Sequence, residues 1–563
     1  MFANFRQAMA WVHTWFGLVL GFVLMICFFF GALSVFDREI DRWAIPDTRF
    51  DPQPMPSYDK VLAPVYKQLR ADPRDMIATG KRVHGEIPHP DTLSLDSLFA
   101  YTTHRDPVLR IGGEFGVPNK PINPDDEHQH VHGFATIDPR TGEFLPDDKL
   151  KIGSDFFYPL HYSLHLHWKN LGYWIVGLAA LIMLAALVSG VVMHRKIFRE
   201  FFTFRPKKQT QRSALDLHNM TGVVALPFHF FFAFTGLVIF AGIYLPVNQT
   251  LLKPLHDHSH VLEADLKGLP HEPAGVQAPL ASVDAMVAEA KRRWAKRDMP
   301  GEVGFLVIEH IGDINSYVSL YRAGSDRVAL VGQPVHFNAS TGEVILEEPA
   351  PTMAASINEF LTGLHLQHFR HWLLRWLYVV GGLLGCICIA TGFIFFVEKR
   401  KQQHAKAGSQ GARVVDALAV TTVTGMLVAT AAMLVTNRLL PAELVGKGVW
   451  EEYSFWGVWL LTLFHAFSRN GAVRKAQLSP AWREQCWAFA GLAFAAVLLN
   501  WITTGDHLGK TLFHYWPVAG VDLSLLVSAA IAVLIARKLR QREAAQLTKD
   551  EQSITKSGEA LHV

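Results

Sequence analysis

The sequence predicts an α-helical integral membrane protein with an internally duplicated core and a helical appendage. Two observations support this. Long apolar runs recur, each long enough to cross the hydrocarbon core of a bilayer as a helix, and the second part of the chain repeats the first. The expected membrane helices lie near residues 8–36, 170–194, 217–245, 372–397, 414–436, 450–468, 486–504 and 516–537.

The repeat unit begins with a membrane helix that opens on a histidine. His13 starts one apolar run and His218 starts another, and in both runs a glycine follows 18 residues later, Gly31 and Gly236. The match continues downstream, with 138–143 echoed by 338–343 at an offset of 200 and 189–190 echoed by 391–392 at an offset of 202. The core therefore consists of two related halves.

The distribution of basic residues predicts the topology. The segment 195–216 carries seven Lys or Arg residues and 398–413 carries five. By the positive-inside rule these loops and both chain ends are cytoplasmic, and the polar segments 37–168 and 246–370 face outward. The first apolar run is too long for a cleaved signal peptide, so we expect it to remain as an anchor. All four cysteines lie within apolar runs and are expected to pack as small core residues.

These boundaries divide the chain into nine parts. The two outward segments mix helical and strand patterns, which predicts a small α+β module in each. Residues 541–563 are polar, and we expect a disordered cytoplasmic tail. The parts are a first membrane helix (1–36), the first outward module (37–168), a second membrane helix (169–194), a cytoplasmic loop (195–216), a third membrane helix (217–245), the second outward module (246–370), a fourth membrane helix (371–397), a four-helix appendage (413–540) and the tail.

Histidines gather at both ends of the core helices. His13, His218 and His194 lie at the cytoplasmic side, whereas 161–167 and 365–371 hold three histidines each at the outer side. His229 follows His218 by 11 residues, about 16 Å along one face of a straight helix. A histidine inside a bilayer is costly and usually functional, although one at a helix end can also simply lie in the headgroup zone.

Paired histidines on facing helices predict haem, because neutral imidazoles fill both axial positions of the iron. For an inner haem we expect His13 and His218, with His194 as the alternative. For an outer haem we expect His165 and His365, with His161, His368 and His229 as alternatives. If 165–194 were one helix it would be about 43 Å long, which exceeds the hydrocarbon core and puts a haem at His165 on the outer surface.

Two further histidine groups lie in the outward modules. In 128–132 and in 256–260 histidines alternate with other residues, so their rings share one face if the segment is a strand. Such a face could bind a transition metal or an iron chelate. A solvated polar loop is the alternative, and we favour it.

Several short strings of this sequence match a known family in the same order: 9–15, 36–43, 160–165, 194–198, 204–206, 216–219, 226–229 and 235–237. By these strings the chain resembles the PepSY-associated transmembrane proteins, often called iron-regulated membrane proteins, some of which are siderophore reductases. The resemblance covers residues 1 to about 400 and implies outward PepSY modules, a four-helix core with two haems b, and electron delivery to ferric chelates in the periplasm. The chain departs from the family in the first helix, where Phe30-Gly31 stands in place of the usual Thr-Gly.

The function predicted is a transmembrane ferric reductase of the bacterial inner membrane. It would use two haems b and act on a ferric siderophore or another ferric chelate. The sequence has no Gly-rich nucleotide fingerprint, so electrons are expected from a membrane quinol or a separate donor protein. We expect the protein to lie in a lipid bilayer and to bind no nucleic acid. The alternatives are a permease for an iron chelate, or a non-enzymatic PepSY regulator of a periplasmic protease.

Overall fold

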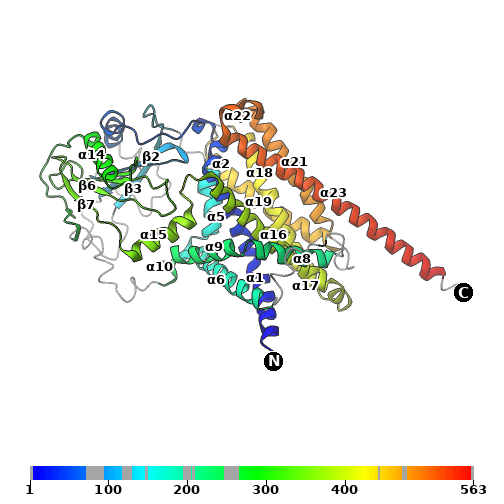
Figure 1. Ribbon diagram of the computed structural model, residues 1–563. Helices are drawn as coiled ribbons and strands as arrows, with labels where there is room; N and C mark the ends of the chain where they lie inside the picture. Colours follow the sequence, from blue (N-terminus) through cyan, green and yellow to red (C-terminus); the bar gives the residue numbers. More distant parts are fainter. Residues whose placement is uncertain are drawn as a thin grey trace. The chain divides into compact units, whose positions relative to one another are not determined.

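A computed structural model describes residues 4–71, 94–116, 130–145, 150–193, 205, 210–245, 266–441, 444–471 and 479–559. The chain divides into two compact units. We call the first the helical unit; it comprises Met1–Pro46, Lys149–Leu237 and Leu374–Val563. The second, the sheet unit, comprises Asp47–Asp148 and Val238–Leu373. Each unit is described by itself (Figure 1).

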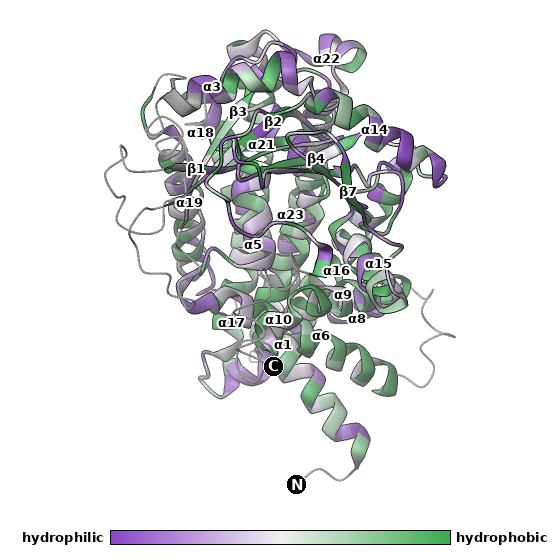
Figure 2. Ribbon diagram, turned by 90° about the vertical axis from the view of Figure 1, so that its left-hand side faces the viewer, coloured by the Kyte–Doolittle hydropathy of each residue, from purple (hydrophilic) through white to green (hydrophobic). Residues whose placement is uncertain are grey.

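The core helices of the helical unit follow the predicted order. Helix α1 spans Phe5–Ser34, and the Asn4 side chain caps its first turn by accepting a hydrogen bond from the Gln7 amide at 3.0 Å. Helix α6 spans Leu171–Met193 and packs along α1. Helix α16 spans Trp372–Lys406. Hydrophobic residues dominate these helices, as α6 shows in Figure 2.

The predicted membrane helix 217–245 is bent. It consists of α8, Thr210–Val224, and α9, Leu226–Ile239, which meet at an angle of 64°. Pro227 explains the break, because its ring nitrogen has no proton to donate to the carbonyl one turn earlier. His218 and His229 therefore lie on different limbs, and the expectation that both share the face of one straight helix is wrong.

Six helices among the described residues are long and apolar enough to cross a membrane, and the bent pair α8–α9 makes a seventh if it is one span. The chain is a multi-pass membrane protein, but eight spans are not shown. The remaining predicted span, 450–468, does form a helix, α19, Lys447–Arg469. This helix is not among those apolar enough to cross a membrane, and it carries Glu451 and Glu452 near its start.

The appendage consists of α17 (Gly411–Val420), a π-helical turn η6 (Thr421–Gly425), α18 (Met426–Leu439), α19, α21 (Ala481–Thr504), α22 (Leu508–His514) and α23 (Trp516–Glu559). Helix α23 is longer than predicted, since 541–559 is helical where a disordered tail was expected. Its Ala, Gln, Lys and Glu residues favour a helix even without apolar packing.

A short helix ties the appendage to the core. Helix α2, Asp37–Ala44, follows α1, and its last carbonyls, those of Trp43 and Ala44, accept hydrogen bonds from Arg438 of α18 at 2.5 and 2.6 Å. The Trp43 indole donates to Asp522 of α23 at 2.7 Å. Helix ends leave carbonyls without partners inside the helix, so Arg438 satisfies groups that burial would otherwise penalise.

The sheet unit contains one antiparallel sheet of seven strands, in the order β3-β2-β1-β4-β5-β6-β7. The strands are β1 (Ser94–Thr103), β2 (Asp106–Gly116), β3 (His130–Ile137), β4 (Val303–Glu309), β5 (Tyr317–Arg322), β6 (Val335–Asn338) and β7 (Val344–Glu347). Strands β1 and β4 pair from Leu98↔Ile308 to Tyr101↔Phe305. The two predicted α+β modules are therefore halves of one sheet.

The two halves of the sheet keep the symmetry of the duplication. Helix α14, Val283–Lys296, and helix α3, Ala63–Ala71, contribute to one hydrophobic core with the strands. The repeated turns at 138–143 and 338–343 have the same geometry, with Gly142 at φ +80° and Gly342 at φ +75°. Only glycine adopts such a backbone readily, which explains the glycine at the same place in both turns.

Candidate functional site

The structure brings together the two histidines that open the repeated helices. His13 of α1 and His218 of α8 have ring centroids 6.0 Å apart, with the ring planes at 84°. Both rings are partly buried. The two halves of the duplication thus meet at this pair, as the sequence predicted for an inner site.

Each of the two rings is held by a carbonyl of the following core helix. The His13 Nδ1 lies 3.0 Å from the Ala186 carbonyl oxygen on α6, and the His218 Nδ1 lies 2.7 Å from the Cys388 carbonyl oxygen on α16. Ala186 and Cys388 are 202 residues apart, the same offset as the repeated Ser-Gly and Thr-Gly pairs. The contact is therefore a product of the duplication, although sequence analysis did not find these two carbonyls.

The repeated glycines make room for the rings. A Cβ atom on Gly190 would lie 3.4 Å from the His13 Cε1, and one on Gly392 would lie 3.4 Å from the His218 Cε1. A side chain larger than alanine at either place would push into the imidazole. Small residues at helix contacts let the backbones approach closely, and here they also set the position of a histidine.

These contacts fit a haem ligand set. A carbonyl can only accept, so each Nδ1 carries the proton and the lone pair is on Nε2, the atom that binds metal.

A third histidine uses the same type of contact at the other end of α1. His161 lies in α5, Tyr158–Tyr162, and its Nδ1 is 2.8 Å from the Cys27 carbonyl oxygen. A Cβ atom on Gly31 would lie 2.8 Å from that Nδ1, so the glycine that follows His13 by 18 residues is required for this position of the ring.

Among the candidate histidines that the structure describes, His229 is the most deeply buried. Its side chain on α9 is 2 % exposed, its ring lies 5.3 Å from the Phe28 ring, and its Nε2 has no hydrogen-bond partner among the described residues. Leaving a buried nitrogen without a partner costs about 1–3 kcal/mol, which marks this ring as a candidate ligand.

His165 is placed differently from the expectation. Residues 164 and 165 adopt left-handed backbone angles, and helix α6 begins only at Leu171, so the assumed continuous helix from 165 to 194 does not exist. The His165 Nε2 lies 2.9 Å from the Phe156 carbonyl oxygen, and the imidazole stacks on the Phe156 ring at 4.8 Å. Burial lowers the pKa of His165, and the charge of His167 adds to this.

The remaining candidates lie elsewhere. His365 is on α15, Met353–Leu366, which belongs to the sheet unit; it is half-buried, and His368 just beyond that helix is exposed. The pairing of His165 with His365 stays a prediction. His194, the side chains of 128–132 and residues 256–260 lie outside the described residues. No group of three or more His, Cys, Asp or Glu side chains in the described part could hold a metal ion, but an axial haem pair needs only two.

Comparison with known proteins identifies the class. The model of the PepSY-associated TM region matches residues 10–399, the part of the chain that contains the core helices and the sheet. The chain therefore belongs to this family of membrane proteins. It is also 25 % identical over 398 residues to a protein of Pseudomonas aeruginosa described as uncharacterized, a match that covers 67 % of this chain and 93 % of the relative.

Proposed function

We propose that this protein is a membrane reductase with two haems b that passes electrons outward to a ferric chelate, such as a ferric siderophore. The observation that carries the proposal is the contact of His13 with His218 at 6.0 Å, in which each ring is oriented by a backbone carbonyl at the repeated position. Haem iron carries one electron at a time between its ferric and ferrous states.

For the inner haem the proposed ligands are His13 and His218. The Ala186 and Cys388 carbonyls keep both rings in the tautomer that presents Nε2 to a metal. Gly190 and Gly392 leave the space that the rings occupy.

For the outer haem the proposal moves from His165 to His161. The His165 Nε2, the usual ligand atom, is directed at the Phe156 carbonyl, whereas the His161 Nδ1 repeats the carbonyl contact of the inner pair. His365 follows His161 by 204 residues, within the 200 to 205 range of the other repeated positions. His365 belongs to the sheet unit and stays a prediction from the sequence. The proposed second ligand is His229 on α9, because its buried Nε2 has no hydrogen-bond partner among the described residues.

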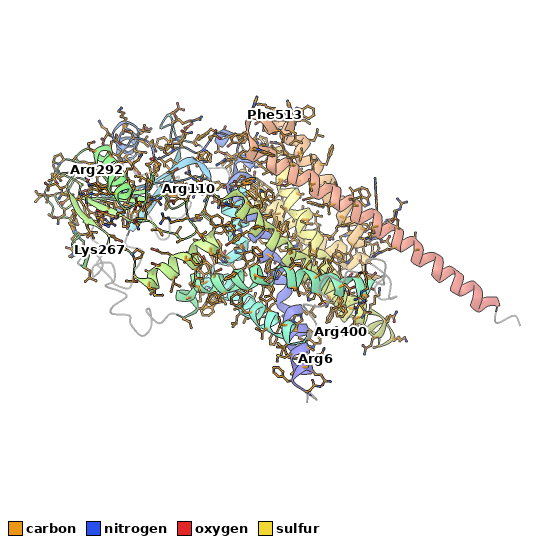
Figure 3. All side chains as sticks on the ribbon, in the orientation of Figure 1. Arg6, Arg110, Lys267, Arg292, Arg400 and Phe513 are labelled. Atoms are coloured by element: carbon orange, nitrogen blue, oxygen red, sulfur yellow. The ribbon has the colours of Figure 1, made fainter. Side chains whose placement is uncertain are left out.

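The direction of transfer follows from the proposed topology. Arg6 of α1 and Arg400 of α16 lie toward the same end of the helical unit (Figure 3), the end nearer to His13 along α1. By the positive-inside rule this end is cytoplasmic. The inner haem would then receive electrons from a quinol or a donor protein, and the outer haem would lie on the side of the ferric substrate, in the bacterial inner membrane.

The test is the haem content of the purified full-length protein, together with its reactivity. We expect two haems b per chain, a six-coordinate low-spin spectrum, and rapid haem reoxidation when ferric siderophore is mixed with the dithionite-reduced protein. His507→Ala, at the start of α22, is the matched control and should keep both haems. A haem-to-protein ratio near zero after expression with adequate haem supply would contradict the proposal and would favour a permease or a regulator.

A further inference from the structure

The first helix of the appendage contains a buried carboxyl group that the proposed haem sites do not use. Asp416 on α17 is 5 % exposed. Its Oδ1 accepts a hydrogen bond from the Trp482 indole of α21 at 3.1 Å, whereas its Oδ2 has no hydrogen-bond partner among the described residues. A buried polar oxygen without a partner is costly, so this oxygen is available to accept a hydrogen bond from a bound molecule.

Groups from two parts of the chain lie near this carboxyl. The Ser479 hydroxyl lies beside it just before α21, and Lys401 and Glu398 of α16 are near enough to interact with its charge. Lys401 and Glu398 form an ion pair at 2.7 Å, with side chains only 10 % and 13 % exposed. A proton accepted by Asp416 therefore has a charged, hydrogen-bonding pair next to it at the end of α16 that we assign to the cytoplasm.

An apolar cluster connects this carboxyl to the inner histidine pair. Trp482, Val415 and Val423 of the appendage pack against the cluster that Leu18, Phe393, Phe396 and Ala419 form. Leu18 lies five residues after His13 on α1, and Phe393 follows Gly392, the residue against which the His218 ring rests. The Asp416–Trp482 pair thus borders the helices that hold both inner rings.

We propose that Asp416 is the proton acceptor of a quinol-oxidation site where α16, α17 and α21 meet, through which electrons enter the protein. This inference rests on the proposed function. A quinol hydroxyl would donate to the Asp416 Oδ2 while its ring lies against the apolar cluster. Oxidation of the quinol would break two O–H bonds, and the two protons would leave in turn through Asp416 toward the Glu398–Lys401 pair. The haems that the core histidines would hold would supply the acceptors for the two electrons, and the product would be a quinone.

A quinol fits this place better than a donor protein does. The acceptor oxygen is buried in the candidate membrane span Gly411–Leu439, a place that suits a lipid-soluble donor better than a soluble protein. An apolar and aromatic cluster lies on one side of the carboxyl group, and Ser479 with the Lys401–Glu398 pair supplies polar groups on the other. This combination matches an apolar ring with a hydroxyl at its edge. The appendage thereby gains a function that the duplicated core does not supply.

The first test measures haem reduction by decylubiquinol and by menadiol in nanodiscs that contain the full chain. Asp416→Asn should slow this reduction about 100-fold, the usual contribution of a proton acceptor, and Asp416→Glu should restore part of the rate. Asp506→Asn, in the short loop after α21, is the control and should leave the rate unchanged. The dithionite-reduced spectrum should be the same in all variants, which separates this inference from the proposal of haem itself.

The second test does not depend on haem. Decylubiquinone added to haem-free protein should shift the infrared band of one carboxyl group, and Asp416→Asn should abolish this shift. If the Asn variant does not fold, Trp482→Phe, which removes the hydrogen bond to Oδ1 but keeps the carboxyl, should weaken quinone binding. Wild-type quinol rates and an unchanged infrared signal in Asp416→Asn would overturn the inference, as would reduction by a soluble donor protein but by neither quinol.

Discussion

Replacing Gly31 with alanine gives a sharp test of the proposed outer haem site. The added Cβ atom would lie 2.8 Å from the Nδ1 and 2.9 Å from the Cε1 of His161. Non-bonded atoms of this type prefer separations of about 3.5–4.0 Å, so the ring has to retreat by roughly 0.6–1 Å. The bond from Nδ1 to the Cys27 carbonyl, now 2.8 Å, would then exceed the range of a good hydrogen bond, about 3.2 Å.

The expected magnitude follows from that contact. Loss of a single hydrogen bond costs about 0.5–1.5 kcal/mol, and loss of the group that orients a metal-bound histidine typically lowers metal affinity about 10–100-fold. Alanine also favours a helix over glycine by about 0.5–1 kcal/mol. Gly31→Ala should therefore weaken haem binding at the proposed outer site while α1 itself remains intact. A general loss of folding would instead disturb α1 as well.

The measurement is a haem-to-protein ratio combined with a redox titration of the purified variants. Gly31→Ala should lose one of two titrating haems, and Gly17→Ala is the control on the same helix because a Cβ atom there would meet nothing within 4 Å. Two unchanged haems in Gly31→Ala would show that His161 is not a ligand held by this contact. Loss of haem in both variants would show that the effect lies in the helix and not in the ring.

Three further predictions concern the inner site, the appendage and the sheet. His13→Ala and His218→Ala should each remove the same haem, measured by redox titration; persistence of two haems in either variant would contradict the pairing. Arg438→Leu should lower the free energy of unfolding by about 2–5 kcal/mol, measured by thermal unfolding in detergent, and Arg438→Lys by less; equal losses would refute the carbonyl contact. Burial opposes protonation of His310, but the 3.1 Å hydrogen bond to Asp96, the charges of Asp96 and Glu309 and a contact with the Pro270 backbone together outweigh it and raise the pKa. The stability that this pair contributes is therefore present below the ordinary histidine pKa of about 6.5 and is lost as pH rises through the raised value. Amide hydrogen exchange of β1 and β4 should show this pH dependence in the wild type and not in His310→Gln.

The duplication made part of the site predictable. Two histidines that open equivalent helices had to lie at similar depth, and His13 and His218 do meet. Turn residues such as Gly142 and Gly342 also have the same conformation in both halves. These features depend on local sequence and on symmetry, and both can be read from one chain.

Other features depend on tertiary contacts that carry no local signal. The pairing of β1 with β4 joins the halves into one sheet, but alternation along each strand only shows that a strand has a buried face. The turn at Leu164 and His165 places two non-glycine residues at positive φ, a conformation that the surrounding packing imposes against local preference. For this reason the assumption of one continuous helix from 165 to 194 failed.

The asymmetry of the duplicated core is as informative as its symmetry. At the offset of 205 that relates His13 to His218, the counterpart of His229 is Leu24, a buried apolar residue. The repeat therefore does not require an imidazole at 229, and burial there with an unpartnered Nε2 is costly. His229 lies against Phe28, next in sequence to the Cys27 whose carbonyl holds His161. An imidazole that symmetry does not demand and that burial penalises is best explained by a ligand on the outer side of the core.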